Sequence, residues 1–180
     1  MESGYHSDQW FDLARLFARP EQLQPFVSEL ARQLSVHRPD AVCGPMTGGA
    51  RLAERIAAEL GVAYLFTDRF EPPDAAGLFP VRYLVPPTLR DVARGKTVAI
   101  VDDAISAGSA VRGTHADLVA CGARPVALGA LFVFGGAAAR FATERKLALE
   151  SVASLDFPLW PPEECPLCRA GQPLERVTDA

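Results

Sequence analysis

The fold of this chain follows from residues 97–110, which read TVAIVDDAISAGSA. The β-branched run at 98–101 is typical of a short, fully buried strand. Asp102 and Asp103 come directly after it, and ligands of open α/β sheets bind just beyond the carboxyl ends of the strands. Carboxylates at that edge can accept hydrogen bonds from vicinal hydroxyls, so the acidic pair predicts a sugar site.

A geometric condition applies to the acidic pair. Successive side chains of a strand point to opposite faces of the sheet. Both carboxylates can therefore serve one ribose only if the chain has left the strand by Asp103.

A loop of small and hydroxyl-bearing residues follows the acidic pair. Residues 111–121 then carry apolar side chains at roughly helical spacing and end before Gly122. Free backbone N–H groups at a helix N-terminus attract phosphate, and nearby hydroxyls add donors. The loop is therefore a candidate phosphate site, with candidate residues Ser106, Ala107, Gly108, Ser109 and Ala110.

Composition favours a one-domain cytoplasmic protein. The chain has 180 residues, 49% of them hydrophobic and 22% charged, which is enough for a sizeable core. A net charge of -4 without a basic block argues against nucleic acid as a partner. No apolar run reaches the length of a membrane span, and the first residues lack a signal-peptide pattern. Four cysteines do not make a disulfide scaffold at this length.

Strand-like and helix-like runs alternate along the chain, which predicts an α/β fold with a Rossmann-like parallel sheet flanked by helices. The expected strands cover residues 41–43, 62–66, 98–101, 125–134 and 147–155, and the expected helices cover 23–34, 52–60, 111–121 and 137–146. Gly61 is expected to cap the helix before it. Residues 70–87 are rich in proline and are interpreted as an extended excursion or flap, outside the core.

A second glycine loop occupies residues 43–51, which read CGPMTGGAR, between an expected strand and an expected helix. One interpretation is a plain turn between the two elements, because an isolated glycine loop is a weak signal. The other is a second phosphate loop that faces the first.

These residues together resemble the type I phosphoribosyltransferases. The family signature for phosphoribosyl pyrophosphate (PRPP) is an apolar strand, an acidic pair and a glycine loop with hydroxyl residues. The resemblance implies that Asp102 and Asp103 orient the ribose and that residues 106–110 anchor the 5′-phosphate. It also implies that a pyrophosphate loop contacts the leaving group through the backbone amides of Met46, Thr47 and Gly48. The alternative is an ordinary buried strand followed by a turn and a capped helix.

The N-terminal residues 3–12, SGYHSDQWFD, are similar to the segment that covers the base in orotate phosphoribosyltransferases. This resemblance implies that Trp10 and Phe11 contact a heteroaromatic base, although aromatic residues also commonly belong to the core. It runs from about residue 1 to 155. The expected organisation is a phosphoribosyltransferase domain at 1–158, with a hood at 1–20 and a flexible flap at 68–88, and a C-terminal tail at 159–180.

Three positions depart from the orotate enzymes. Glu2 stands where that group has a lysine, and a carboxylate there would repel an anionic base. Gly135 and Gly136 follow the strand that normally ends in a base-contacting arginine. The mobile loop of the family carries an Arg-Lys pair followed by Lys-x-His-Gly. Residues 69–77 here read RFEPPDAAG and retain only Arg69 as a pyrophosphate contact.

The missing loop cations would weaken leaving-group stabilisation. Loss of one such donor typically costs about 3 to 4 kcal/mol of barrier, so a compensating group or slow turnover is expected. The nearest candidates for a replacement are Arg82, Arg90 and Lys96.

The resemblance implies a nucleotide-metabolism enzyme of the kind used in pyrimidine biosynthesis. It would transfer ribose 5-phosphate from Mg²⁺-bound PRPP to a base, which need not be orotate, and release pyrophosphate, with Asp102, Asp103 and Arg69 as catalytic residues. The resemblance also implies a homodimer. The alternative is a regulatory protein that binds PRPP or a nucleotide without turning it over. A dinucleotide-binding protein is disfavoured, because no Gly-x-Gly-x-x-Gly opens a helix after a strand.

The tail carries Cys165 and Cys168, which have the spacing of a zinc knuckle. Structural Zn²⁺ takes four ligands, and Cys43 and Cys121 fall in expected core elements, so a complete site would need a second tail or a distant histidine. A reduced thiol pair and a redox disulfide are the other interpretations. The three histidines, His6, His37 and His115, are too scattered in sequence to predict metal ligands, and surface or capping roles are expected for them.

Overall fold

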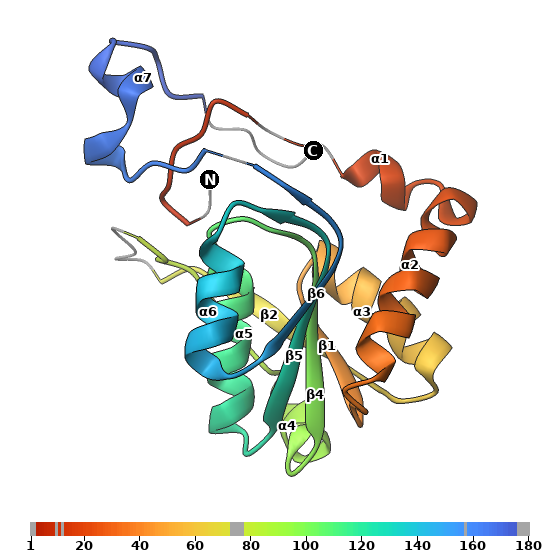
Figure 1. The fold of residues 1–180 in the computed structure, drawn as a ribbon. Helices are drawn as coiled ribbons and strands as arrows, with labels where there is room; N and C mark the ends of the chain where they lie inside the picture. Colours follow the sequence, from red (N-terminus) through yellow and green to blue (C-terminus); the bar gives the residue numbers. More distant parts are fainter. Residues whose placement is uncertain (1–2, 10, 12, 73–77, 157, 176–180) are drawn as a thin grey trace.

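A computed structural model shows a six-stranded sheet with helices on both faces (Figure 1). The structure describes residues 3–9, 11, 13–72, 78–156 and 158–175. The strands are β1 (Ala41–Pro45), β2 (Ala63–Phe70), β3 (Arg82–Leu84), β4 (Thr97–Ile105), β5 (Arg124–Phe134) and β6 (Ala148–Leu155). The helices are α1 (Ala14–Phe17), α2 (Pro20–Ser35), α3 (Gly48–Leu60), α4 (Pro87–Ala93), α5 (Ser109–Ala120), α6 (Ala137–Arg145) and α7 (Pro166–Arg169), with one 3₁₀ turn at Pro162–Glu164.

The strand order in the sheet is β3-β2-β1-β4-β5-β6. All neighbours are parallel except β2 and β3, which form an antiparallel edge pair. The chain builds outward from β1 to β2 and β3, then crosses back to β4 beside β1. Ligands of doubly wound sheets bind at this kind of switch point, so the carboxyl ends of β1 and β4 are where a ligand is expected.

Two hydrophobic layers hold the helices on the sheet. Helices α2 and α3 pack on one face, where Leu30, Leu52 and Ile56 meet Val42 and Val101. The other face is covered by α4, α5 and α6, whose buried side chains meet the opposite side chains of the same strands. Figure 1 shows these two helical layers on either side of the sheet. Because β1 and β4 are covered on both faces, only their ends are available for chemistry.

The predicted α/β architecture is confirmed, and several boundaries differ. Gly61 ends α3 with φ of 66°, as expected for a left-handed glycine cap. Strand β4 runs on through the acidic pair to Ile105, and α5 begins at Ser109, two residues before the predicted start. No helix was predicted over α4, which begins with a proline after the extended segment.

Part of the expected flap belongs to the core, contrary to the sequence interpretation. Val81, Tyr83 and Val85 are all buried, and they alternate with exposed neighbours as β3 adds to the sheet edge. Gly113 permits this contact, because a Cβ atom at that residue of α5 would lie 3.1 Å from the Tyr83 ring.

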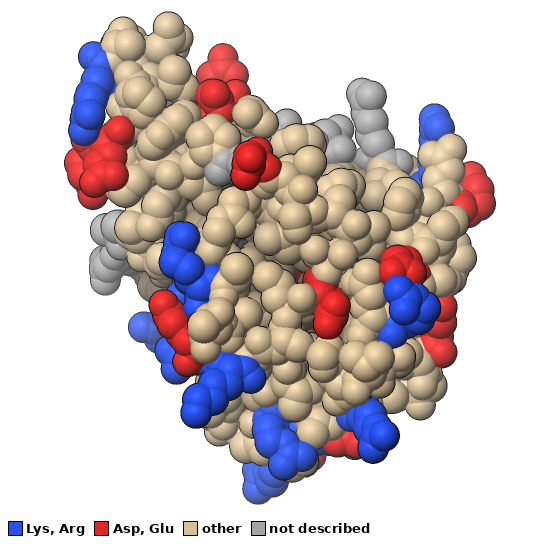
Figure 2. All heavy atoms as spheres, viewed as in Figure 1, with Lys and Arg blue, Asp and Glu red and all other residues tan. Residues whose placement is uncertain are grey.

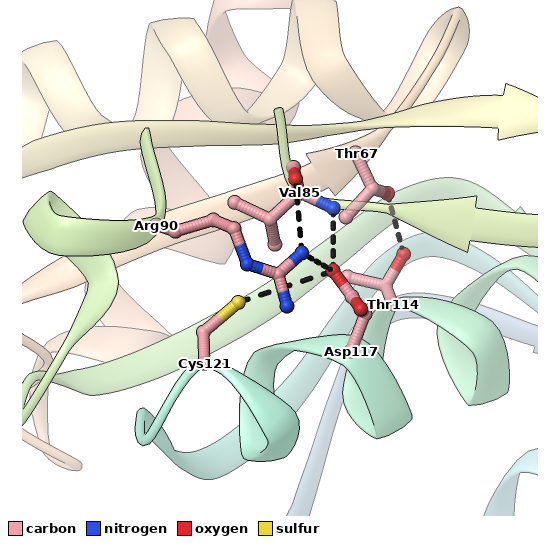
Figure 3. A network of polar contacts seen from close by, with 6 residues as sticks. All are labelled: Thr67, Val85, Arg90, Thr114, Asp117 and Cys121. Carbon is pink, nitrogen blue, oxygen red and sulfur yellow. Dashed lines mark hydrogen bonds and ion pairs between the residues drawn. The ribbon is translucent and has the colours of Figure 1, made fainter. Parts of the chain in front are cut away.

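A polar network ties the segment after β3 to α5 (Figure 3). The Asp117 carboxylate accepts a hydrogen bond from the Val85 N–H at 2.7 Å and pairs with the Arg90 guanidinium at 3.3 Å. The buried hydroxyls of Thr67 and Thr114 lie 2.8 Å apart and link β2 to the same helix. These contacts fix the base of the flap against α5.

Charged side chains are unevenly spread over the face drawn in Figure 2. Lys and Arg gather toward the end of the molecule where α4 lies, whereas the end with the tail shows both acidic and basic side chains. Among the described residues, no helix is both long and apolar enough to cross a membrane.

Candidate active site at the ends of β1 and β4

The acidic pair and the 43–51 glycine loop meet at the switch point of the sheet. A Cβ atom at Gly49 would lie 2.7 Å from Asp102 Oδ1, and one at Gly48 would overlap the Asp103 carboxylate. The two carboxylates therefore border consecutive glycines at the start of α3. Two sequence segments about 50 residues apart are brought together by strand pairing between β1 and β4.

The two carboxylates have different surroundings. Asp102 is buried, with 8% of its surface exposed, and its Oδ1 accepts a hydrogen bond from the Asp103 N–H at 3.0 Å. Asp103 is partly exposed and accepts from the Ala104 N–H at 2.8 Å. Since β4 continues to Ile105, the chain has not left the strand at Asp103, and the condition for both carboxylates to serve one ribose is not met. Asp103 is the more accessible of the two.

The turn from β1 into α3 is packed so closely that no side chain fits at Gly44, Gly48 or Gly49. A Cβ atom at Gly44 would overlap the Gly49 carbonyl, so the loop folds back on its own backbone. The Met46 N–H donates to the Thr67 carbonyl at 2.9 Å, and the Met46–Thr47 peptide bond is cis. The loop is thus anchored to β2 as well as to β4.

The 106–110 loop turns directly into α5. Gly108 has φ of 82°, a left-handed conformation that favours glycine, and its carbonyl accepts from the Arg112 N–H at 3.0 Å. Ala107 is buried, while Ser106 and Ser109 are partly exposed. The first backbone N–H groups of α5 point out of the helix at this end, as an anion site requires.

Arg112 lies beside the 106–110 loop, and the sequence interpretation did not single it out. Its guanidinium lies 4.5 Å from the Phe141 ring centroid and 5.6 Å from that of Phe79. Its buried Nε atom has no hydrogen-bond partner within the part of the chain that the structure describes. Its spacing in the sequence could have indicated this position, because residue 112 lies one helical turn after Gly108 and on the same side of α5.

The N-terminal segment lies over this end of the sheet. Phe11 stacks on Phe134 at the end of β5, with ring centroids 4.8 Å apart. The Phe79 N–H of the flap donates to the Ser3 carbonyl at 3.0 Å, and Tyr5 packs against the Phe79 ring. The predicted base contact at Trp10 falls outside the described residues.

Two of the basic residues suggested for the pyrophosphate, Arg90 and Lys96, are placed away from the acidic pair. Arg69 forms an ion pair with Glu71 at 3.0 Å near the end of β2. Arg90 pairs with Asp117, as described above, and Lys96 precedes β4 and so lies at the opposite end of that strand from the acidic pair. The suggestions that Arg90 and Lys96 replace the missing loop cations are therefore wrong. Arg82 is exposed on the edge strand β3.

Although the histidines are scattered in sequence, the fold places His6 beside the two tail cysteines. The ring Nδ1 of His6 lies 3.2 Å from the Cys168 Sγ, and His6, Cys165 and Cys168 each place a ligand atom within 4.8 Å of the others. The other two cysteines lie elsewhere, in β1 and after α5. Burial raises the pKa of Cys43 well above its ordinary value, and burial together with Asp117 raises that of Cys121, so both remain thiols.

Comparisons with known proteins agree with the fold and with the sequence motifs. A family model described as "Phosphoribosyl transferase domain" matches residues 21–154. An orotate phosphoribosyltransferase of Thermotoga maritima is 32% identical over 178 residues, which cover 98% of this chain and 87% of the relative. The orotate phosphoribosyltransferase of Heliobacterium modesticaldum is also 32% identical, over 96% of this chain and 84% of the relative.

Solved structures show the same fold at lower identity. The adenine phosphoribosyltransferase of Thermoanaerobacter pseudethanolicus superimposes with a TM-score of 0.67 at 17% identity, covering 81% of this chain and 88% of that one. The orotate phosphoribosyltransferase of Aeropyrum pernix gives a TM-score of 0.66 at 22% identity, covering 81% and 78%. The shared architecture includes the sheet that positions the two loops and the acidic pair.

Proposed function

Because this chain belongs to the phosphoribosyltransferase family, we propose that it transfers ribose 5-phosphate from PRPP to a ring nitrogen of a heteroaromatic base at the ends of β1 and β4. The observation that carries the proposal is the contact between the loop glycines, Gly48 and Gly49, and the two carboxylates. The bond between the anomeric carbon and the pyrophosphate oxygen breaks, and the base nitrogen forms the new bond to that carbon.

The two carboxylates receive separate roles in this proposal. Asp103 is partly exposed, so it accepts hydrogen bonds from the ribose hydroxyls. Asp102 is buried between Gly49 and the Asp103 N–H, so it holds the loop and its neighbour in position. Positioning of this kind matters because a misplacement of about 1 Å can cost about 100-fold in rate.

The two loops bind the two ends of PRPP. Residues 106–110 anchor the 5′-phosphate through backbone N–H groups at the start of α5. The amides of Met46, Thr47 and Gly48 contact the pyrophosphate, and Arg69 at the end of β2 adds a positive charge once it leaves Glu71.

The donor set fits Mg²⁺, which takes oxygen ligands from one or two carboxylates together with substrate phosphates. Asp102 and Asp103 are the carboxylates at hand. When bound with PRPP, Mg²⁺ neutralises charge on the departing pyrophosphate. The protein holds the ribose and both phosphate groups so that the anomeric carbon faces the base.

An uncharged base fits this chain better than orotate. Phe11 and Phe134 supply flat apolar surface at the end of β5, where glycines follow in place of a cation. Glu2 adds a negative charge to the N-terminal segment, which disfavours an anionic base. Orotate stays among the candidate bases, because the relatives are named orotate phosphoribosyltransferases.

A homodimer is also part of the proposal, on the basis of the family resemblance alone. Light scattering of the purified protein tests it, and a monomer at micromolar concentration contradicts it.

The test of function is pyrophosphate release from PRPP and Mg²⁺ with a panel of bases that includes orotate, adenine and uracil. Calorimetry measures PRPP binding in parallel. The Asp102→Asn/Asp103→Asn variant is expected to lose at least about 100-fold in kcat/KM. Asp91→Asn is the matched control, since that exposed carboxylate lies on α4 and pairs with Arg94.

Each outcome has a definite meaning. Base-dependent release that the double variant loses supports the transferase and identifies its substrate. PRPP binding without release for any base favours a regulatory protein that binds PRPP or a nucleotide. Absence of PRPP binding contradicts the site itself.

A further inference from the structure

A histidine of the N-terminal segment and two cysteines of the tail converge where the two segments meet. The three ligand atoms come from positions 6, 165 and 168 and lie within 4.8 Å of one another. We propose that His6, Cys165 and Cys168 bind a Zn²⁺ ion that fastens the N-terminal segment to the C-terminal tail. The proposal is independent of the transfer reaction, since the metal is measured without substrate.

The distances are those of a site that closes around zinc by small adjustments. Zinc binds sulfur at about 2.3 Å and imidazole nitrogen at about 2.0 to 2.1 Å, so tetrahedral ligands stand about 3.5 to 3.8 Å apart. The His6 Nδ1 and Cys168 Sγ atoms are 3.2 Å apart, and the whole set falls within 4.8 Å. Side-chain rotations alone can bring three such atoms to the zinc distances.

The backbone holds these ligands from two independent sides. On one side, His6 and Trp160 exchange two backbone hydrogen bonds of 2.8 and 3.0 Å as an antiparallel bridge. On the other, Cys165 precedes the short helix α7, and its carbonyl accepts from the Arg169 N–H at 3.2 Å. This turn brings Cys168 round to the side of Cys165 that His6 occupies.

Burial separates the two cysteines. Cys165 is 1% exposed, whereas Cys168 is exposed. One sulfur of the cluster is therefore buried, while the other sulfur and the imidazole are accessible to solvent. A metal can enter from solvent and still be held against a protected ligand.

The donor types favour zinc over Mg²⁺ at this cluster. Two thiolates and one imidazole are borderline-soft ligands that suit Zn²⁺, whereas Mg²⁺ takes oxygen ligands. On binding, the two thiols release their protons to solvent, and the imidazole binds through its neutral Nδ1 atom. No fourth His, Cys, Asp or Glu joins the cluster within the described ranges, and a water molecule can fill the remaining position.

The proposed metal has a structural consequence for the cover of the active site. The segment that His6 fixes also carries Ser3, Tyr5 and Phe11, which contact the flap and the end of β5. Zinc would hold this segment in place from the side opposite to the flap.

The experiment begins with metal analysis of the full-length protein, purified with reductant and without chelator. We expect about one zinc per chain, and Co²⁺ exchange should give the charge-transfer absorption of thiolate ligands. The Cys165→Ser/Cys168→Ser variant should lose the metal. His6→Ala should weaken zinc binding by at least about 100-fold, since loss of a ligand exceeds the 10- to 100-fold cost of disturbing its outer partners.

Matched controls use residues of the same types elsewhere in the chain. His37 lies far from the tail in sequence and pairs with Glu150, and Cys121 follows α5. The variants His37→Ala and Cys121→Ala should therefore retain zinc. A second readout uses the wild-type protein alone: a chelator should lower its melting temperature and expose the N-terminal segment to protease, and added zinc should reverse both.

Several results would overturn the proposal. One is wild-type protein that binds zinc no more tightly than the double cysteine variant. Another is His6→Ala protein with unchanged affinity, which would remove the link to the N-terminal segment. A Cys165–Cys168 disulfide that forms in air, in protein that takes up no zinc after reduction, would favour a redox pair.

Discussion

The ends of β1 and β4 are more closely packed than the N-terminal segment, the flap and the tail. At the strand ends, glycines press directly against carboxylates and carbonyls, and no space remains for a side chain at residues 44, 48 or 49. Over that end of the sheet, the N-terminal segment, the flap and the tail touch through a few ring contacts, a few backbone hydrogen bonds and the His6–Cys168 contact. Phe11 and Phe79 remain more than a third exposed in these contacts.

This difference separates two tasks. A substrate group that never changes, such as ribose phosphate, can be bound by a backbone arrangement fixed by the sheet. The base contacts proposed above lie on segments with fewer close contacts, which suits a part of the site that must admit and release a ligand. Perturbations of the strand ends should therefore abolish turnover, whereas perturbations above them should change affinity for the base.

The largest effect is expected for Gly48→Ala. The added methyl group would overlap the Asp103 carboxylate and displace it, so kcat/KM for pyrophosphate release should fall by about 100-fold. Ala58→Gly on the exposed side of α3 is the control, with a loss of about 1 kcal/mol in stability and little change in activity. A Gly48→Ala enzyme with wild-type kcat/KM would contradict the close packing on which the contrast depends.

A smaller effect is expected for Asp117→Asn, which tests the joint between the two regions. The variant removes the negative charge of the carboxylate that accepts hydrogen bonds from the Val85 N–H and Arg90. The free energy of unfolding should therefore fall by about 2 kcal/mol in urea titrations. Asp91→Asn, whose side chain is 90% exposed, should stay within about 0.5 kcal/mol of wild type. Equal losses in the two variants would show that the base of the flap is not anchored through Asp117.

The smallest effect is expected for Phe11→Ala. Aromatic pairs contribute about 0.5 to 1.5 kcal/mol, so KM for the base should rise by about two- to tenfold while PRPP affinity stays unchanged. Phe26→Ala, at an exposed phenylalanine of α2, is the control and should leave both unchanged. An equal loss of PRPP affinity in Phe11→Ala would show that Phe11 also contributes to PRPP binding, so the two regions would not have separate tasks.

The strand ends were largely predictable from sequence, because their signals are local. The run at 98–101 and the two glycine loops fix strand, turn and helix start within a few residues of each other. The extension of β4 to Ile105 was missed because acidic residues are uncommon in strands, and here pairing with β5 overrides that preference.

The upper segments were less predictable, because their contacts join residues far apart in the chain. Nothing in the spacing of His6 indicates that it meets Cys168, and the bridge to Trp160 that brings them together is a tertiary contact. The burial of Tyr83 likewise depends on Gly113, a glycine in the middle of a helix whose role is visible only from the packing. Local propensity carries no information on such pairings.

The overlap between Gly44 and the Gly49 carbonyl has a consequence for how this loop can change over generations. A side chain at residue 44 would require Gly49 to shift, and a shift of Gly49 would disturb Asp102. Each single substitution at these positions is therefore expected to disturb the site. The loop is expected to change only through several simultaneous replacements. Residues 44, 48, 49, 102 and 103 are therefore expected to change together, whereas the segments proposed to contact the base can change one residue at a time.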